Sequence, residues 1–341
     1  MARSSRAAPA LSAALLAIQA VTAQPARSEP LAFFQPTAIV AADEREQLDR
    51  GQPIARILPA AELEVAVFAA VPTDVNGDRL VSWIRSIGAL KKSSYVLAIG
   101  RFSDSPRLED LAGLALDDEE VSGVRQCRPG DCAFKLAAAE MAELQRAADL
   151  QQAFRQMLLR RVRAYLAEGQ SALPAYEDHA RPVQPAARMA ALIGHTAFLI
   201  ERLPRFTEYL EGYPRVAMPE VESFLYWSKE RLAGNAMIGV THVSILRGAS
   251  PDAPDALVAG RQIFATRYVN ASLAFTALVH GAPGARNYLV YLNRSDVDPV
   301  GGMFSGIVRW FIQRRLKVDA GDVLLGVKQR LESGEPSPLP R

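Results

Sequence analysis

The chain has 341 residues, of which 49% are hydrophobic and 22% are charged, and this composition excludes disorder of the whole chain. Lys and Arg total 39 against 37 Asp and Glu. If an N-terminal segment with Arg3 and Arg6 is removed, as argued below, 37 charges of each sign remain. Nucleic-acid binding needs a basic surface, so the balance argues against a nucleic-acid partner.

The N-terminus has the pattern of a secretory signal peptide. A basic start is followed by the apolar run Ala8 to Val21 and by the small residues Val21-Thr22-Ala23, which suit cleavage. A membrane-spanning helix is the alternative, but it needs roughly 20 strongly apolar residues, and Ser12 and Gln19 interrupt this run. We expect residues 1–23 to be removed and the product to be periplasmic or secreted. Residues 24–50 then form a leader, with a short helix at 43–50.

Residues 51–102 are predicted to form two strands, a helix and a third strand. Pro53–Leu58 and Glu62–Ala70 have strand character, the second with clear alternation. Asp78–Leu90 has apolar residues at helical spacing, and Asp78 is placed to cap that helix. Ser94–Phe102 returns to strand character.

Two cysteines, Cys127 and Cys132, lie in the segment Cys-Arg-Pro-Gly-Asp-Cys. The Pro129-Gly130 turn would bring them together, which predicts a disulfide. A metal site lacks further ligands nearby, and the four-residue spacer differs from that of thioredoxin-like redox centres. No metal and no cofactor is predicted.

The segment from Lys135 to Leu210 has helical periodicity. Two helices are expected, joined by a Pro-rich loop, with Pro204 marking the end of the second. This segment is predicted to form most of a mainly helical insertion, residues 107–215, in a domain that spans residues 51–333. A Pro-rich tail, 334–341, follows.

The last third of the chain reads as an antiparallel meander. Its predicted strands are bounded by Gly, Pro, Asn or Asp: Phe224–Leu232, Ala236–Arg247, Leu257–Tyr268, Ala271–Val279 and Arg286–Asn293. From Met303 to Leu316 the apolar residues recur at three and four, which predicts an amphipathic helix. The fold class expected is α+β, with a curved antiparallel sheet gripping a long C-terminal helix.

This order of elements resembles the helix-grip fold of START-like lipid-transfer domains. The similarity covers residues 53–102 and 221–331, and its most suggestive part is Tyr288 to Asn293, Pro299 to Phe304 and the helix through Trp310. The resemblance implies a hydrophobic cavity beneath the C-terminal helix. It rests on element order and not on a specific motif, and the central helical segment departs from it.

Motifs of catalytic sites are absent from the sequence, including nucleophile elbows, phosphate-binding loops and His-Glu-x-x-His. His242 lies within a predicted strand, where a histidine is more often structural than catalytic. Glu230 and Arg261 could pair to hold a ligand head group, although a solvent-facing position is the more common alternative. The candidate ligand-binding residues are Tyr226, Trp227, Glu230, His242, Arg261, Phe264, Tyr291, Ile307 and Phe311; no catalytic residue is assigned.

Three functions remain open. The first is binding or transfer of a lipid or other hydrophobic small molecule, with peripheral contact to a membrane through the basic face of the last helix. The second is an enzyme on the same scaffold, cyclase- or hydrolase-like, which would need His242 or Glu230 to converge in the cavity. The third is a non-catalytic envelope interaction protein.

Overall fold

The computed structural model describes residues 29–61, 63–232, 234–248, 253–281, 284–298 and 321–336. The predicted signal peptide, and the helix predicted from Met303 to Leu316 with Ile307 and Phe311, lie outside these residues.

One antiparallel sheet of eight strands forms the centre of the protein, in the order β1-β2-β8-β7-β6-β5-β4-β3. Every strand predicted from alternation is confirmed, with ends shifted by a few residues. The strand bounds are β1 Ile54–Leu58, β2 Glu64–Thr73, β3 Val96–Arg101, β4 Val221–Leu232, β5 Asn235–Arg247, β6 Ala256–Ala265, β7 Val269–Val279 and β8 Asn287–Val297. The end strands β1 and β3 do not pair with each other, so the sheet is not closed into a barrel.

Helices occupy the connections that join β2 to β3 and β3 to β4, and both ends of the described chain. The α-helices are α1 Ala42–Asp49, α2 Gly77–Arg85, α3 Ile87–Leu90, α4 Asp118–Gln126, α5 Ala138–Arg146, α6 Leu150–Glu168, α7 Pro185–Gly194, α8 Ala197–Arg202 and α9 Pro204–Gly212. Short 3-10 helices are η1 Pro30–Phe34, η2 Leu108–Leu111 and η3 Gln170–Ala172. Residues 321–332 are also helical.

Two details of the helix predictions were wrong. The cap of α2 is Asn76, whose side chain accepts a hydrogen bond from the Arg79 amide at 3.0 Å, and not Asp78, which lies within the first turn. The segment 135–210 contains five α-helices and one 3-10 helix, and not the two helices predicted. Pro204 begins α9 because proline is well suited to the first position of a helix, where its missing N–H has no partner in any case.

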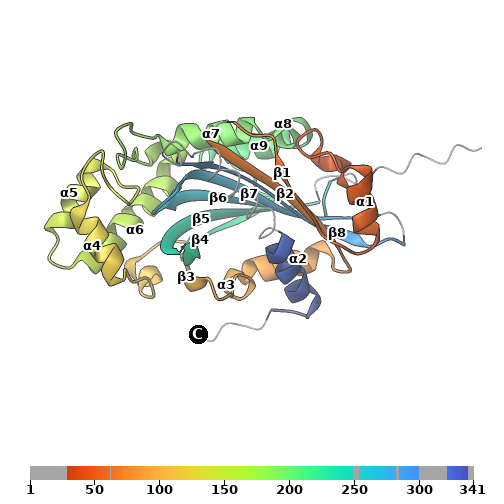
Figure 1. Ribbon diagram of the computed structural model, residues 1–341, viewed down its shortest axis with the longest axis horizontal. Helices are drawn as coiled ribbons and strands as arrows, with labels where there is room; N and C mark the ends of the chain where they lie inside the picture. Colours follow the sequence, from red (N-terminus) through yellow and green to blue (C-terminus); the bar gives the residue numbers. More distant parts are fainter. Residues whose placement is uncertain are drawn as a thin grey trace, which may run out of the picture.

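The sheet has an outer and an inner face, and each is covered by different helices (Figure 1). Helices α7, α8 and α9 lie across the outer face of β1, β2, β8, β7 and β6. Helices α4 to α6 cover the outer face of β4 to β6, where Trp227 and Val240 are buried. Helices α2 and α3, with Leu324 and Leu331 of the C-terminal helical residues, pack on one part of the inner face.

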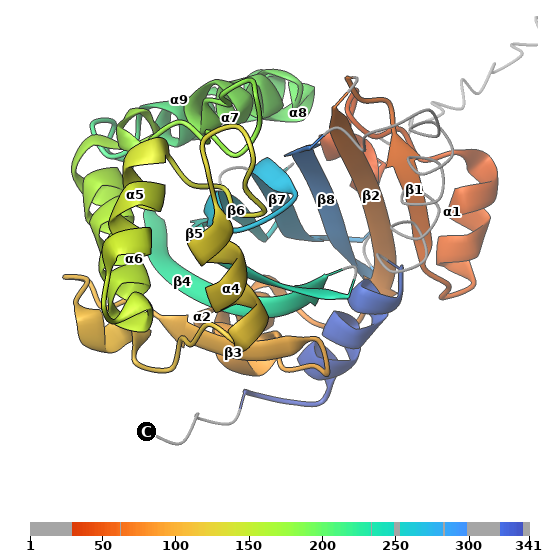
Figure 2. The same ribbon diagram turned by 60° about the vertical axis from the view of Figure 1, so that its left-hand side comes forward.

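The sheet curves toward its inner face, as Figure 2 shows. Four strand steps separate β4 from β8, which in a flat sheet would be roughly 19 Å. Nevertheless Lys91 lies 5.5 Å from the ring of Tyr226 on β4 and also acts electrostatically on Tyr291 of β8. Consistent with this curvature, the described residues form two separate apolar clusters on the outer face and one on the inner face.

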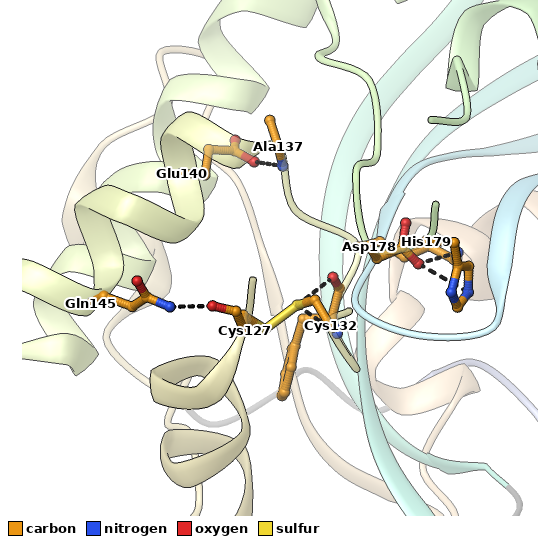
Figure 3. The surroundings of a disulfide bond; sticks show 9 residues. Cys127, Cys132, Ala137, Glu140, Gln145, Asp178 and His179 are labelled. Atoms are coloured by element: carbon orange, nitrogen blue, oxygen red, sulfur yellow. Dashed lines mark hydrogen bonds and ion pairs between the residues drawn. A yellow bond between two sulfur atoms is a disulfide. The ribbon is translucent and has the colours of Figure 1, made fainter. Parts of the chain in front are cut away.

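Cys127 and Cys132 form the disulfide predicted from the turn between them, with a Cα–Cα distance of 4.4 Å. Figure 3 shows the bridge at the end of α4, where the side-chain amide of Gln145 donates to the carbonyl of Cys127. The bridge therefore fixes the turn between α4 and the segment leading to α5.

None of the helices in the described residues combines the length and the apolar content that crossing a bilayer requires.

Candidate functional site

The middle of the inner face carries small and polar side chains where a core would have large apolar ones. Along β7 and β8, outer-face residues are fully buried while inner-face residues in alternation with them are only half-buried. We call these half-buried residues of β5 to β8 the inner polar patch: Thr241, Gly260, Gln262, Ser272, Ala274, Thr276, Tyr291, Asn293 and Ser295. They form adjacent rows across the paired strands. Water therefore reaches the centre of a sheet whose other face is sealed.

Gly260 has room for the first carbon of a side chain. The heavy atoms nearest to a Cβ added there would be the Thr241 methyl at 3.6 Å and the Cβ and carbonyl oxygen of Ala274, both at 4.0 Å, which are ordinary contact distances. Crowding by a neighbouring side chain is therefore not the reason for a glycine at position 260.

Part of the inner polar patch is occupied by its own hydrogen bonds, and part is free. The Ser272 hydroxyl accepts from the Asn293 amide at 3.0 Å and from the Ser295 hydroxyl at 2.8 Å. The side chains of Gln262 and Thr241 have no hydrogen-bond partner among the described residues. These two groups can donate to and accept from a bound molecule without breaking an existing bond.

An ion pair lies at one end of the patch. Lys91, in the turn after α3, contacts the Glu230 carboxylate of β4 at 2.6 Å, and the Ser228 hydroxyl donates to the same carboxylate at 2.5 Å. The ammonium group of Lys91 lies 5.5 Å from the centre of the Tyr226 ring, and Tyr291 is close enough to interact with it electrostatically. An ion pair and a tyrosine ring thus meet at the edge of an uncharged polar surface, with Tyr291 of that surface within electrostatic reach.

The ionisation of this end is fixed by its contacts. Burial would raise the pKa of Glu230, but Lys91 and Ser228 outweigh it and the pKa lies below its usual value. Burial would lower the pKa of Lys91, but Tyr226 and Glu230 raise it. Burial raises the pKa of Tyr291 to about 12. At neutral pH the end therefore presents a charged pair and a phenolic hydroxyl able to donate.

A second polar cluster is buried beneath the outer face. His242 of β5 and Arg261 of β6 are almost fully buried, and their nearest nitrogens, Arg261 Nη2 and His242 Nδ1, are 3.3 Å apart. The Tyr165 hydroxyl of α6 lies 2.7 Å from the same His242 Nδ1, and the ring of Tyr213 packs 4.5 Å from the His242 ring. The cluster therefore joins two strands to α6 and to the residue that follows α9.

Arg261 is a buried cation with no carboxylate in ion-pair contact among the described residues. Its guanidinium donates to the carbonyl of Leu210 near the end of α9 and lies about equally far from the rings of Tyr165 and Tyr213, at 5.5 and 5.6 Å. The negative end of a helix and two aromatic faces both favour a positive charge. These contacts take the place of an acidic partner.

His242 is neutral in this setting. Burial, and then the charge of Arg261, lower its pKa well below 6.5. Because an arginine can only donate, His242 Nδ1 accepts from Arg261, and the ring proton of the neutral imidazole belongs on Nε2. That nitrogen has no hydrogen-bond partner in the described part of the chain.

The predicted site residues are divided between the two faces. Tyr226, Glu230 and Tyr291 come together on the inner face around Lys91, whereas His242 and Arg261 come together beneath the outer face. The pairing of Glu230 with Arg261, which the sequence left open beside a solvent-facing position, does not form, because strand alternation directs the two side chains to opposite faces. For the same reason His242 and Glu230 cannot act together as an acid–base pair.

Two further predicted residues have packing roles on the outer face. Trp227 donates from its indole nitrogen to the Asp110 carbonyl at 2.8 Å, and it lies so close to Gly100 that a Cβ there would approach its ring to 2.7 Å. Phe264 lies under the guanidinium of Arg161 at 4.7 Å. Neither lines the inner polar patch.

Sequence reasoning missed Lys91 and most of the inner polar patch. The signal for the patch was available, since small or polar residues occupy alternate positions of three consecutive strands: Gly260 and Gln262, then Ser272, Ala274 and Thr276, then Asn293 and Ser295. This alternation identifies a binding surface only when it is known which face of the sheet is the inner one. Lys91 lies in a turn, and no local pattern places it beside strands that come later in the chain.

One group of side chains in the described residues has metal-binding types, namely Asp178, His179 and Asp298. The buried ammonium of Lys135 already contacts Asp178 at 3.2 Å and Asp298 at 2.6 Å. A lysine thus supplies the positive charge that a metal ion would bring.

No protein-family model, no curated protein and no solved structure matches the chain.

Proposed function

We propose that the protein binds an amphipathic small molecule, such as a lipid with a polar group, against the inner face of its sheet, in the exported compartment indicated by its N-terminus. The observation that carries the proposal is the inner polar patch, a half-buried surface in the centre of a sheet whose opposite face is buried at the same strands. A binding surface of this kind needs a few placed polar groups within an apolar surrounding.

The surroundings of the patch suit such a ligand. Val243 and Val258 on the same face supply apolar contact, and Gln262 supplies free hydrogen-bonding groups. The Lys91–Glu230 pair at one end would interact with a polar or charged head group. A ligand with both characters fits this lining better than the purely hydrophobic one expected from the sequence.

The order of elements also supports the proposal. Strand β2, helices α2 and α3, strand β3, the meander β4 to β8 and a C-terminal helical segment follow the order on which the resemblance to START-like domains was based.

The test is to fill the space above Gly260. Gly260→Leu places a side chain where the ligand would lie, and Gly194→Leu is the matched control because Gly194 is exposed with nothing near its Cβ position. Each protein is purified from its exported compartment, extracted with organic solvent and analysed by mass spectrometry, with urea unfolding in parallel.

We expect the wild type and Gly194→Leu to release the same small molecule, and Gly260→Leu to release at least about tenfold less with an unchanged unfolding midpoint. A wild-type protein that carries no extractable molecule and binds no lipid or fatty-acyl probe would contradict the proposal, as would equal retention by Gly260→Leu.

A further inference from the structure

The edge of the sheet at β3 carries an exposed apolar and basic surface, which we call the tip patch: Tyr95, Leu97, Leu232, Lys92 and Arg231. In the described part of the chain, seven large apolar side chains are strongly exposed, and Tyr95, Leu97 and Leu232 are three of them, at 53%, 44% and 40%. They are neighbours, since the Arg231 amide donates to the Tyr95 carbonyl at 2.8 Å and Val96 pairs with Glu230.

The charge of the tip patch is positive. Neither Lys92 nor Arg231 forms an ion pair with any described residue, and the nearby carboxylate of Glu230 is already bound by Lys91. The loop that presents Lys92 is held in place by Arg330, whose guanidinium donates to the carbonyls of Leu90 and Lys92 at 2.7 and 2.5 Å. The patch is therefore a fixed surface with two uncompensated cations.

The geometry points to an anionic lipid surface as the partner, so we propose that the tip patch docks the protein on a membrane. Tyrosine and leucine side chains enter the interfacial region of a bilayer, and adjacent Lys and Arg are attracted to anionic head groups. Three exposed side chains fall far short of the roughly 800 Å² that each partner buries in a stable protein interface. Addition of a partner strand is disfavoured as well, because the ladder of β3 is broken by an irregularity at Leu97.

The tip patch adjoins the proposed ligand site. Lys91 contacts Glu230 on the inner face at 2.6 Å, and the next residue, Lys92, is exposed to solvent. Docking here would bring the charged end of the site toward the head groups from which an amphipathic ligand is taken. The role of docking in ligand uptake rests on the proposed function, whereas binding of the tip patch to a membrane can be measured without any ligand.

The test uses flotation of the mature protein with vesicles of phosphatidylcholine alone and of phosphatidylcholine with 30% phosphatidylglycerol. The variant carries Tyr95→Ser, Leu97→Ser and Arg231→Glu. Its control carries Ile200→Ser and Arg202→Glu, because Ile200 is similarly exposed at 48% on α8 and Arg202 lies beside it without an ion pair among the described residues.

We expect the wild type and the control to float with anionic vesicles, to float at least about fivefold less with neutral ones, and to be released as salt rises toward 0.5 M. The tip variant should lose at least about tenfold in vesicle binding while its circular dichroism and its retention of an extractable ligand stay unchanged. Wild-type protein that floats with neither vesicle would overturn the inference, as would equal loss in the control. A concentration-dependent dimer that the tip variant abolishes would overturn it in favour of a second copy of the chain.

Loss of vesicle binding without loss of the bound molecule distinguishes this inference from the proposed function. If the wild type floats with anionic vesicles but carries no ligand, the docking inference stands and the proposed function fails.

Discussion

At the scale of single residues, the most unusual group is Arg261, a buried cation that has no acidic partner among the described residues. Removing charge from water is costly unless the charge is paired or well hydrogen-bonded. The charge of Arg261 is stabilised by the carbonyl of Leu210, by the rings of two tyrosines and by the lone pair of His242 Nδ1. Protonation of His242 would place a second positive charge beside Arg261, which is why the histidine stays neutral.

This arrangement predicts a pH dependence of stability. The folded pKa of His242 lies well below 6.5, so below about pH 6.5 the unfolded chain binds a proton that the folded chain does not. Its contribution to stability is present above pH 6.5 and is lost as the pH falls toward the folded pKa. Between pH 7.5 and 5.5 the wild type should lose about 1.4 kcal/mol more unfolding free energy than His242→Gln.

The measurement is urea unfolding of both proteins at each pH. Parallel losses in the two proteins would show that His242 is protonated in the folded state as readily as in the unfolded one, and would contradict this account.

At the scale of elements, the strands were predictable because each carries its own alternation and its own turn signals. Alternation within a strand also fixes which residues share a face: Phe224 and Tyr226 share the inner face with Val243, and Leu225 shares the outer face with Val240. Which face is inner could not be read, since it depends on where helices from other parts of the chain pack. The contact of His242 with Tyr165 is likewise long-range and leaves no local pattern.

The disulfide at the end of α4 is expected to stiffen a turn rather than to hold the fold together. Because the closed loop is short, Cys127→Ala with Cys132→Ala should lower the unfolding free energy by about 2 kcal/mol and leave the far-ultraviolet circular dichroism unchanged. Urea unfolding with and without dithiothreitol checks this. Reductant should lower the wild type to the level of the variant and have no effect on the variant itself; unfolding of the wild type by reductant alone would contradict it.

At the scale of the whole molecule, the segment between β3 and β4 is more than an appended insertion. Its helices seal the outer face, where Trp227, Phe264 and Phe275 are buried. The buried contacts of Lys135 with Asp178 and Asp298 also join this segment to the end of β8. The apolar clusters of the outer face therefore contain residues from both the sheet and the helical segment.

Deletion of residues 107–215, with a short Gly-Ser linker in their place, tests this dependence. We expect the shortened chain to aggregate or to lose its near-ultraviolet circular dichroism and bind a hydrophobic dye, because large apolar side chains of the outer face become exposed. A soluble monomer with cooperative urea unfolding would show instead that the segment is a separate unit.

The pairing of β2 with β8 also determines when the protein can fold. All ten residues of β2 are buried, yet Glu64 pairs with Asp296, so the partner strand is synthesised long after β2. Until then β2 can pair only with β1, and an isolated hairpin is marginally stable at best in water. Closing so long a loop slows folding, and an unpaired apolar strand promotes aggregation in the meantime. The sheet can therefore be completed only after synthesis has passed β8.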